Sequence, residues 1–152
     1  MNKEANNNRL IESELLNYGV YASTTRGVSM EPLFRTGRDV VFLSRPEGEL
    51  KKYDIALYRM PSGKYVMHRV VKVKENEYII RGDNTFVPEH VPKDKILAVL
   101  TEFNRKGKKY SCSSRSYRIY SVLWTFIYPV RYVLHLVRRA LGKIYRTLIR
   151  RK

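Results

Sequence analysis

Short runs of β-branched and aromatic residues follow one another through the middle of the chain. Turn-forming sequences separate them, among them Pro61-Ser62-Gly63 and Gly82-Asp83-Asn84. Short strands joined by tight turns are typical of antiparallel sheets. We therefore predict a mainly β fold, a small antiparallel barrel or coiled sheet, over residues 20–111. Its strands are expected at Val40–Leu43, Ile55–Tyr58, Tyr65–Val73, Tyr78–Ile80 and Ile96–Leu100, with a last hairpin in residues 104–118.

Helical patterns flank this region on both sides. Within the polar residues 1–19, apolar positions at helical spacing predict a short helix over Arg9–Tyr18, and Gly19 is a stop signal. A second helix is expected from Ser121 onward, with a kink or break at Pro129. It makes residues 112–152 a basic amphipathic tail. Basic side chains fall on one side of its wheel (Arg131, His135, Arg138, Arg139, Lys143, Arg146, Arg150) and apolar ones on the other (Val130, Val133, Leu134, Val137, Ala140, Leu141, Ile144, Leu148).

Charge divides the chain into two unequal parts. The 152 residues carry thirty Lys and Arg against fourteen Asp and Glu, a formal net charge of +16. Residues 1–102 hold sixteen basic and fourteen acidic side chains, whereas residues 103–152 hold fourteen basic and none acidic. A near-neutral domain therefore carries a strongly basic tail. The single cysteine, Cys112, excludes an internal disulfide framework and a multi-cysteine metal site, and we expect its thiol to be inert.

The tail has the composition of a membrane-surface segment. Its uncharged stretch, Ile119–Val130, is twelve residues long, whereas crossing a bilayer takes about 20. We expect it to lie on the membrane, at the cytoplasmic face, because the N-terminus has no signal-peptide pattern. Nucleic acid, a partner's groove and packing on the chain's own domain are the alternatives, and the broad apolar face argues against nucleic acid. Aromatic residues suited to a headgroup region are Trp124, Phe126, Tyr128 and Tyr132.

Three strings contain residues capable of chemistry. Ser29 lies in a turn between Gly27 and Pro32, where backbone N–H groups can stabilise an oxyanion. His68 lies inside a predicted strand and can accept a proton near neutral pH. Asp83 can hold a histidine tautomer. Taken singly, each also fits an ordinary structural role: a turn serine, a buried strand histidine and an Asx turn.

Taken together and in order, these strings resemble the signal peptidase I superfamily, which includes the self-cleaving SOS repressors. The resemblance covers residues 20 to about 100 and implies a β-rich catalytic core with Ser29 as nucleophile. His68 stands where most bacterial members have a lysine, as in the endoplasmic-reticulum, archaeal and sporulation-type branch, which implies Asp83 as the assisting acid. The matching strings are Gly27-Val28-Ser29-Met30-Glu31-Pro32, Gly37-Arg38-Asp39-Val40-Val41, Asp54-Ile55-Ala56, His68-Arg69-Val70-Val71 and Arg81-Gly82-Asp83-Asn84.

The chain departs from the family pattern in three places. Gly27 stands where many members have a serine that assists the oxyanion hole. Glu89 lies where the endoplasmic-reticulum enzymes have a further aspartate, and as a weak substitute it is left out of the predicted site. The usual N-terminal membrane anchor is missing, and the amphipathic C-terminal segment takes its place.

The resemblance implies a membrane-associated serine endopeptidase without cofactor or metal. It would cleave a signal or leader segment from a precursor polypeptide that binds as an extended strand at a sheet edge. One alternative is a cytoplasmic maturation protease for small precursor peptides. Another is a regulator of SOS-repressor type, for which the first twenty residues leave no room for a helix-turn-helix domain. The last is a non-catalytic binding module.

Overall fold

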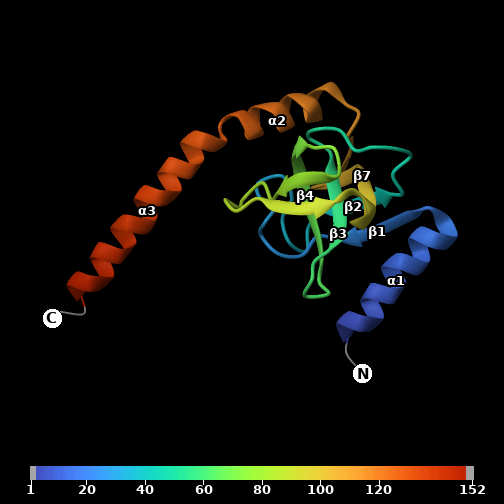
Figure 1. The fold of residues 1–152 in the computed structure, drawn as a ribbon, viewed down its shortest axis with the longest axis horizontal. Coiled ribbons are helices and arrows are strands. Elements are labelled where there is room, and N and C mark those ends of the chain that lie inside the picture. The colour runs from blue at the N-terminus through green and yellow to red at the C-terminus, as the bar shows by residue number, and fades with distance from the viewer. Residues whose placement is uncertain (1–2, 150–152) are drawn as a thin grey trace.

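A curled antiparallel sheet forms the body of the molecule, with helices at both ends of the chain (Figure 1). The computed structural model describes residues 3–149. Three helices accompany the sheet: α1 (Lys3–Tyr18), α2 (Arg115–Phe126) and α3 (Tyr128–Ile149). The strands are β1 (Val20–Thr24), β2 (Val40–Ser44), β3 (Ile55–Arg59), β4 (Tyr65–Val73), β5 (Glu77–Arg81), β6 (Glu89–Pro92), β7 (Ile96–Arg105) and β8 (Lys108–Ser111), with a short 3₁₀ turn, η1 (Lys93–Lys95), before β7.

Strand order confirms the predicted mainly β, antiparallel architecture. The sheet runs β1-β2-β7-β3-β4-β5-β6, and β8 pairs with the second half of β7. All five predicted strands are present, and the predicted last hairpin is β7–β8, whose turn places Lys106 and Gly107 at positive φ. The sequence pattern did not predict the edge strands β1 and β6. In β1 the run of β-forming residues stops after Tyr21, and β6 is four residues long and contains a proline.

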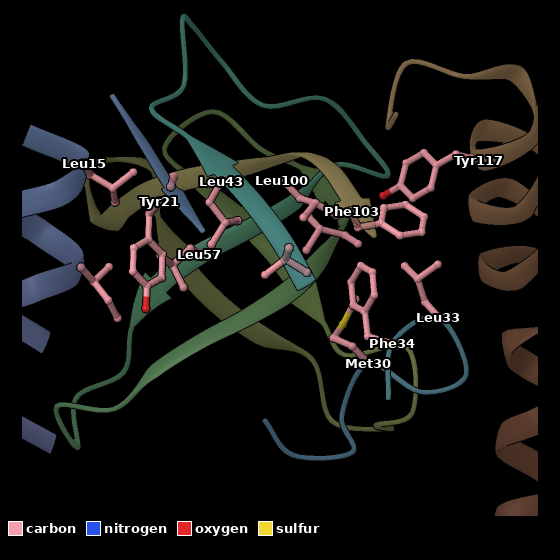
Figure 2. Packing of buried hydrophobic residues seen from close by; sticks show 14 residues of the cluster. Leu15, Tyr21, Met30, Leu33, Phe34, Leu43, Leu57, Leu100, Phe103 and Tyr117 are labelled. Atoms are coloured by element: carbon pink, nitrogen blue, oxygen red, sulfur yellow. The ribbon is translucent and has the colours of Figure 1, made fainter. Parts of the chain in front are cut away.

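Two hydrophobic clusters lie on opposite faces of the sheet. Along β3, Leu57 joins the first cluster, while Ala56 and Tyr58 join the second, because successive strand residues point to opposite faces. The first cluster also includes Leu15 of α1 and Tyr117 of α2, so both helices close this face of the sheet (Figure 2). It contains Met30, Leu33 and Phe34 as well, which follow Ser29 directly and fix the position of its turn.

Two helix boundaries differ from prediction, and the first is the start of α1, which begins at Lys3 and not at Arg9. Gly19 ends α1 at φ +71°, a conformation that favours glycine. The second predicted helix starts at Arg115 and not at Ser121, because the Ser114 side chain accepts the N–H of Tyr117 and caps it. Pro129 lies in the first turn of α3, where its missing N–H costs nothing. The predicted break is therefore confirmed, between Phe126 and Tyr128.

The basic tail divides into two parts with different surroundings. In α2, Tyr117 and Ser121 are buried against the sheet, so this helix packs on its own domain, one of the alternatives left open by the sequence. The C-terminal half of α3 instead projects away from the sheet (Figure 1). Arg150 lies outside the described residues, as do the side chains of Ile144 and Leu148. In the range 3–149, no helix is long and apolar enough to cross a bilayer.

Candidate functional site

Ser29 lies in a tight loop between β1 and β2 that the chain braces from both ends. Gly27 has φ +80°, which a side chain would strain, and its carbonyl accepts the Thr36 hydroxyl at 2.7 Å. The buried Asp39 closes the loop by accepting the N–H of Arg35 at 2.8 Å. Within the described chain, the N–H of Ser29 donates no hydrogen bond. It is therefore available to an oxyanion that forms at the Ser29 hydroxyl.

His68 is buried in the middle of β4, and its ring is held from one side. Its Nδ1 lies 3.0 Å from a carboxylate oxygen of Glu89 and 3.1 Å from the Tyr58 hydroxyl. Tyr58 itself donates a short hydrogen bond to the other oxygen of Glu89. Since that phenol gives its proton to Glu89, Nδ1–H of His68 is the donor to the carboxylate. The lone pair is thereby left on Nε2, which has no hydrogen-bond partner among the described residues.

Asp83 contacts the neighbour of His68 and not His68 itself. Its two carboxylate oxygens accept Nε and Nη2 of Arg69, each at 2.7 Å. The remaining nitrogen of Arg69 donates to the Ser121 hydroxyl at 2.8 Å and to the Tyr53 carbonyl at 3.0 Å. Because His68 and Arg69 are consecutive strand residues, their side chains leave β4 on opposite faces. The predicted contact between Asp83 and His68 is therefore not formed.

The turn at residues 82–84 ties the Ser29 loop to the rest of the sheet. Asn84 donates its backbone N–H to the Ser29 carbonyl at 2.7 Å and its side-chain amide to the Val28 carbonyl at 3.2 Å. A Cβ on Gly82 would lie 2.7 Å from that same Ser29 carbonyl, so only glycine allows this approach. Through the Arg69–Asp83 pair, the turn also contacts β4 at the residue after His68. This turn therefore contacts both the Ser29 loop and the strand that contains His68.

The last two helices also contact this turn. Trp124 donates its indole N–H to the Asp83 carbonyl at 3.0 Å, and Tyr128 donates to the Phe86 carbonyl at 3.1 Å. The Phe86 ring stacks on His135 with a centroid separation of 4.2 Å. The headgroup role of these aromatics stays a prediction. Trp124 and Tyr128 bind the domain, whereas Phe126 is 79% exposed.

Electrostatics favour a neutral imidazole at His68. Burial lowers its pKa, and this effect exceeds the opposing charge and hydrogen bond of Glu89 and the more remote charge of Asp83. Burial, together with the bond to Glu89, raises the pKa of Tyr58, which keeps its phenol protonated as a donor. Burial lowers the pKa of Arg69, but the bonds and charge of Asp83 more than offset this, so its pKa is raised. The base is thus unprotonated at neutral pH, and the adjacent ion pair stays charged.

The contacts of Ser29 reach β4 through the turn at residues 82–84, which binds Arg69, the residue after His68. In the described part of the chain, the Ser29 hydroxyl makes no hydrogen bond with His68. Contacts between nucleophile and base are often long in free enzymes and shorten when substrate binds. Residues 3–149 contain no group of three or more metal-ligating side chains. Burial raises the pKa of Cys112 to about 12, so that its thiol stays protonated at neutral pH.

Sequence reasoning missed Tyr58 and was wrong to leave Glu89 out of the site as a weak substitute. The position of Tyr58 beside His68 can be inferred from the β3–β4 hairpin. Ala56 pairs with His68, and Tyr58 lies two residues after Ala56 on β3, so Tyr58 and His68 share one face of the sheet. Glu89 belongs to the unpredicted strand β6, where it pairs with Ile80. Placing the carboxylate beside His68 required that pairing to be known.

No protein-family model matches the chain, and no curated protein matches it significantly. The functional conclusion therefore depends on the geometry of the site and on the motifs.

Proposed function

We propose that the protein is a serine endopeptidase that cleaves a signal or leader segment from a precursor polypeptide. Ser29 is the nucleophile and His68 the general base, and Glu89, with Tyr58, orients His68. Asp83 holds the structure together through Arg69. The observation that carries this proposal is the buried imidazole of His68, whose Nδ1 is bound by a carboxylate 3.0 Å away while its Nε2 is left to accept the proton of the nucleophile.

The reaction follows from these positions. Nε2 of His68 takes the proton of the Ser29 hydroxyl as Oγ attacks the peptide carbonyl, and a C–O bond forms. The oxyanion that results is stabilised by the N–H of Ser29. His68 then gives its proton to the leaving amine as the C–N bond breaks, and a water molecule repeats the sequence to release the acyl group. Glu89 stabilises the imidazolium in both halves, the role that an acid has beside histidine in serine hydrolases.

Unpaired strand edges offer a site for an extended substrate. The first four residues of β4, Tyr65–His68, pair with β3 on one side, and β5 begins its pairing only at Arg69. The strand β1, which leads into the Ser29 loop, pairs only with β2. A peptide added as a strand at such an edge is held by backbone hydrogen bonds. Under this proposal, the scissile carbonyl of that peptide reaches the Ser29 hydroxyl.

A fluorophosphonate probe tests the mechanism, because it reacts covalently with an activated serine. We expect the full chain to be labelled and both Ser29→Ala and His68→Ala to lose labelling by about 10²-fold or more. The double variant should be scarcely worse than either single one, since the pair acts as a unit. Matched controls are Ser62→Ala in the β3–β4 turn and His90→Ala in β6, which is exposed to solvent.

Cleavage-site mapping on a peptide library by mass spectrometry then identifies the substrate. Cuts within extended segments that vanish in Ser29→Ala support the endopeptidase. An unlabelled wild-type chain that still binds peptides would overturn the proposal and favour a non-catalytic binding module. Cleavage confined to short leader peptides would favour the maturation protease over a signal peptidase.

A further inference from the structure

The helix α3 presents an apolar surface that the domain does not cover. Its members are between 49% and 63% exposed, and a shallow hollow runs between them at the start of the helix. The neighbouring α2 continues this surface with Phe126, which is 79% exposed. We call it the arm face, made of Ile119, Leu123, Phe126, Val130, Val133, Leu134, Val137 and Leu141.

The domain occupies the opposite side of the same helices. At about 100° per residue, Val130 lies about 140° around α3 from His135, whose ring stacks on Phe86. In α2, Tyr117 and Ser121 are buried against the sheet. In α3 the arm face therefore points away from the protein core, whereas in α2 Phe126 also borders a hollow that the domain lines. A helix packed on its own domain has the reverse arrangement, with its apolar side inward.

Charge on the arm identifies what would cover this face. Residues 103–152 contain fourteen basic and no acidic side chains. Arg138 lies about 80° around α3 from Val130, at the border of the arm face, and is exposed. A second copy of the chain would bring the same positive charge against this face, whereas anionic lipids supply both an acyl boundary for the apolar residues and negative headgroups for the basic side chains.

We infer that the arm face binds the surface of an anionic membrane, with α2 and α3 lying in the interface and the β-domain above them. Because Trp124 and Tyr128 bind the turn after Asp83, such docking would hold the Ser29 site close to the bilayer. Apolar residues would insert and the basic side chains would reach the headgroups. The inference concerns lipid binding alone and stands independently of the peptidase activity.

Vesicle sedimentation with the full chain tests this inference. We expect binding to phosphatidylcholine vesicles that contain phosphatidylglycerol, with only part of it released by high salt. Val133→Glu combined with Val137→Glu should weaken binding by about tenfold or more, since each carboxylate removes an inserted side chain and is repelled by the headgroups. The control is Leu16→Glu, which places one carboxylate on an exposed leucine of α1 and is compared with Val133→Glu alone as well as with the double variant. Arg138→Gln should weaken binding only to the anionic vesicles.

Several results would overturn the inference. Undiminished binding of the Val133/Val137 variant would mean that the arm binds through its positive charge alone, without inserting apolar side chains. An RNA would then fit this surface as well as a membrane does. Equal loss in Leu16→Glu would mean that the arm face is not the contact. Self-association of the wild-type chain that Val133→Glu abolishes, without vesicle binding, would assign the face to a second copy. Resistance to alkaline carbonate extraction would mean that the arm crosses the bilayer.

Discussion

Replacing Asp83 by asparagine should lower stability far more than it lowers chemistry. Arg69 and Asp83 form a paired, almost fully buried ion pair, with side chains 1% and 3% exposed and two contacts of 2.7 Å. The amide of Asp83→Asn would keep the shape of the carboxylate but leave the guanidinium without a counter-charge. Removing one partner of a buried pair costs about 3–5 kcal/mol.

That cost is large for a chain of this size. Small proteins have a total stability of about 5–15 kcal/mol. For a chain of 152 residues, each kcal/mol lowers the Tm by about 2–4 °C, so we expect Asp83→Asn to lower the Tm by roughly 6–20 °C. Asp94→Asn removes an exposed ion pair of the same kind and serves as the control, with little change expected.

Thermal unfolding followed by circular dichroism, together with fluorophosphonate labelling well below the Tm, separates the two roles of Asp83. The folded variant should retain most of the labelling rate, because Glu89 contacts His68 and Asp83 does not. The combination of Asp83→Asn with Arg69→Met should recover part of the lost stability, since no buried charge is then unpaired. An unchanged Tm accompanied by a large loss of labelling would refute this reasoning and make Asp83 the orienting acid.

Two further predictions concern the neighbours of Ser29 and His68. The labelling rate should stay on its plateau as pH falls below about 6.5, because burial lowers the pKa of His68. In Glu89→Gln the plateau rate should fall about tenfold or more, and the acidic limb of the pH profile should move to lower pH, since a charge that favours the imidazolium is gone. An acidic limb that moves to higher pH would contradict the role given to Glu89. Gly82→Ala should destabilise the protein by about 1–3 kcal/mol and slow labelling at Ser29, because its Cβ would meet the Ser29 carbonyl. The control is Gly48→Ala, since a Cβ at Gly48 has open space around it. Identical melting and labelling curves for the two variants would contradict the role given to Gly82.

Much of the fold follows from local sequence patterns. The runs of β-branched and aromatic residues predicted β2, β3, β4, β5 and the first half of β7, because in such strands the alternation of side chains and the turn residues are both local signals. The break at Pro129 was equally predictable, since proline has no N–H to continue a helix. The edge strands were not, because β1 and β6 are strands only through their pairing with β2 and β5.

The site divides in the same way. The sequence by itself determined the candidates Ser29 and His68, because the motifs that contain them are contiguous. Only the tertiary structure decided which carboxylate reaches His68. Asp83 and Glu89 were both available in sequence, but Asp83 faces Arg69 across the other side of β4, and Glu89 reaches His68 through the pairing of β6. Likewise, the helical spacing of apolar and basic residues showed that the tail is amphipathic. Only the packing shows that α2 is buried against the domain on one side, while the apolar side of α3 faces away from it. Contacts between segments far apart in the chain depend on long-range packing, which no local pattern encodes.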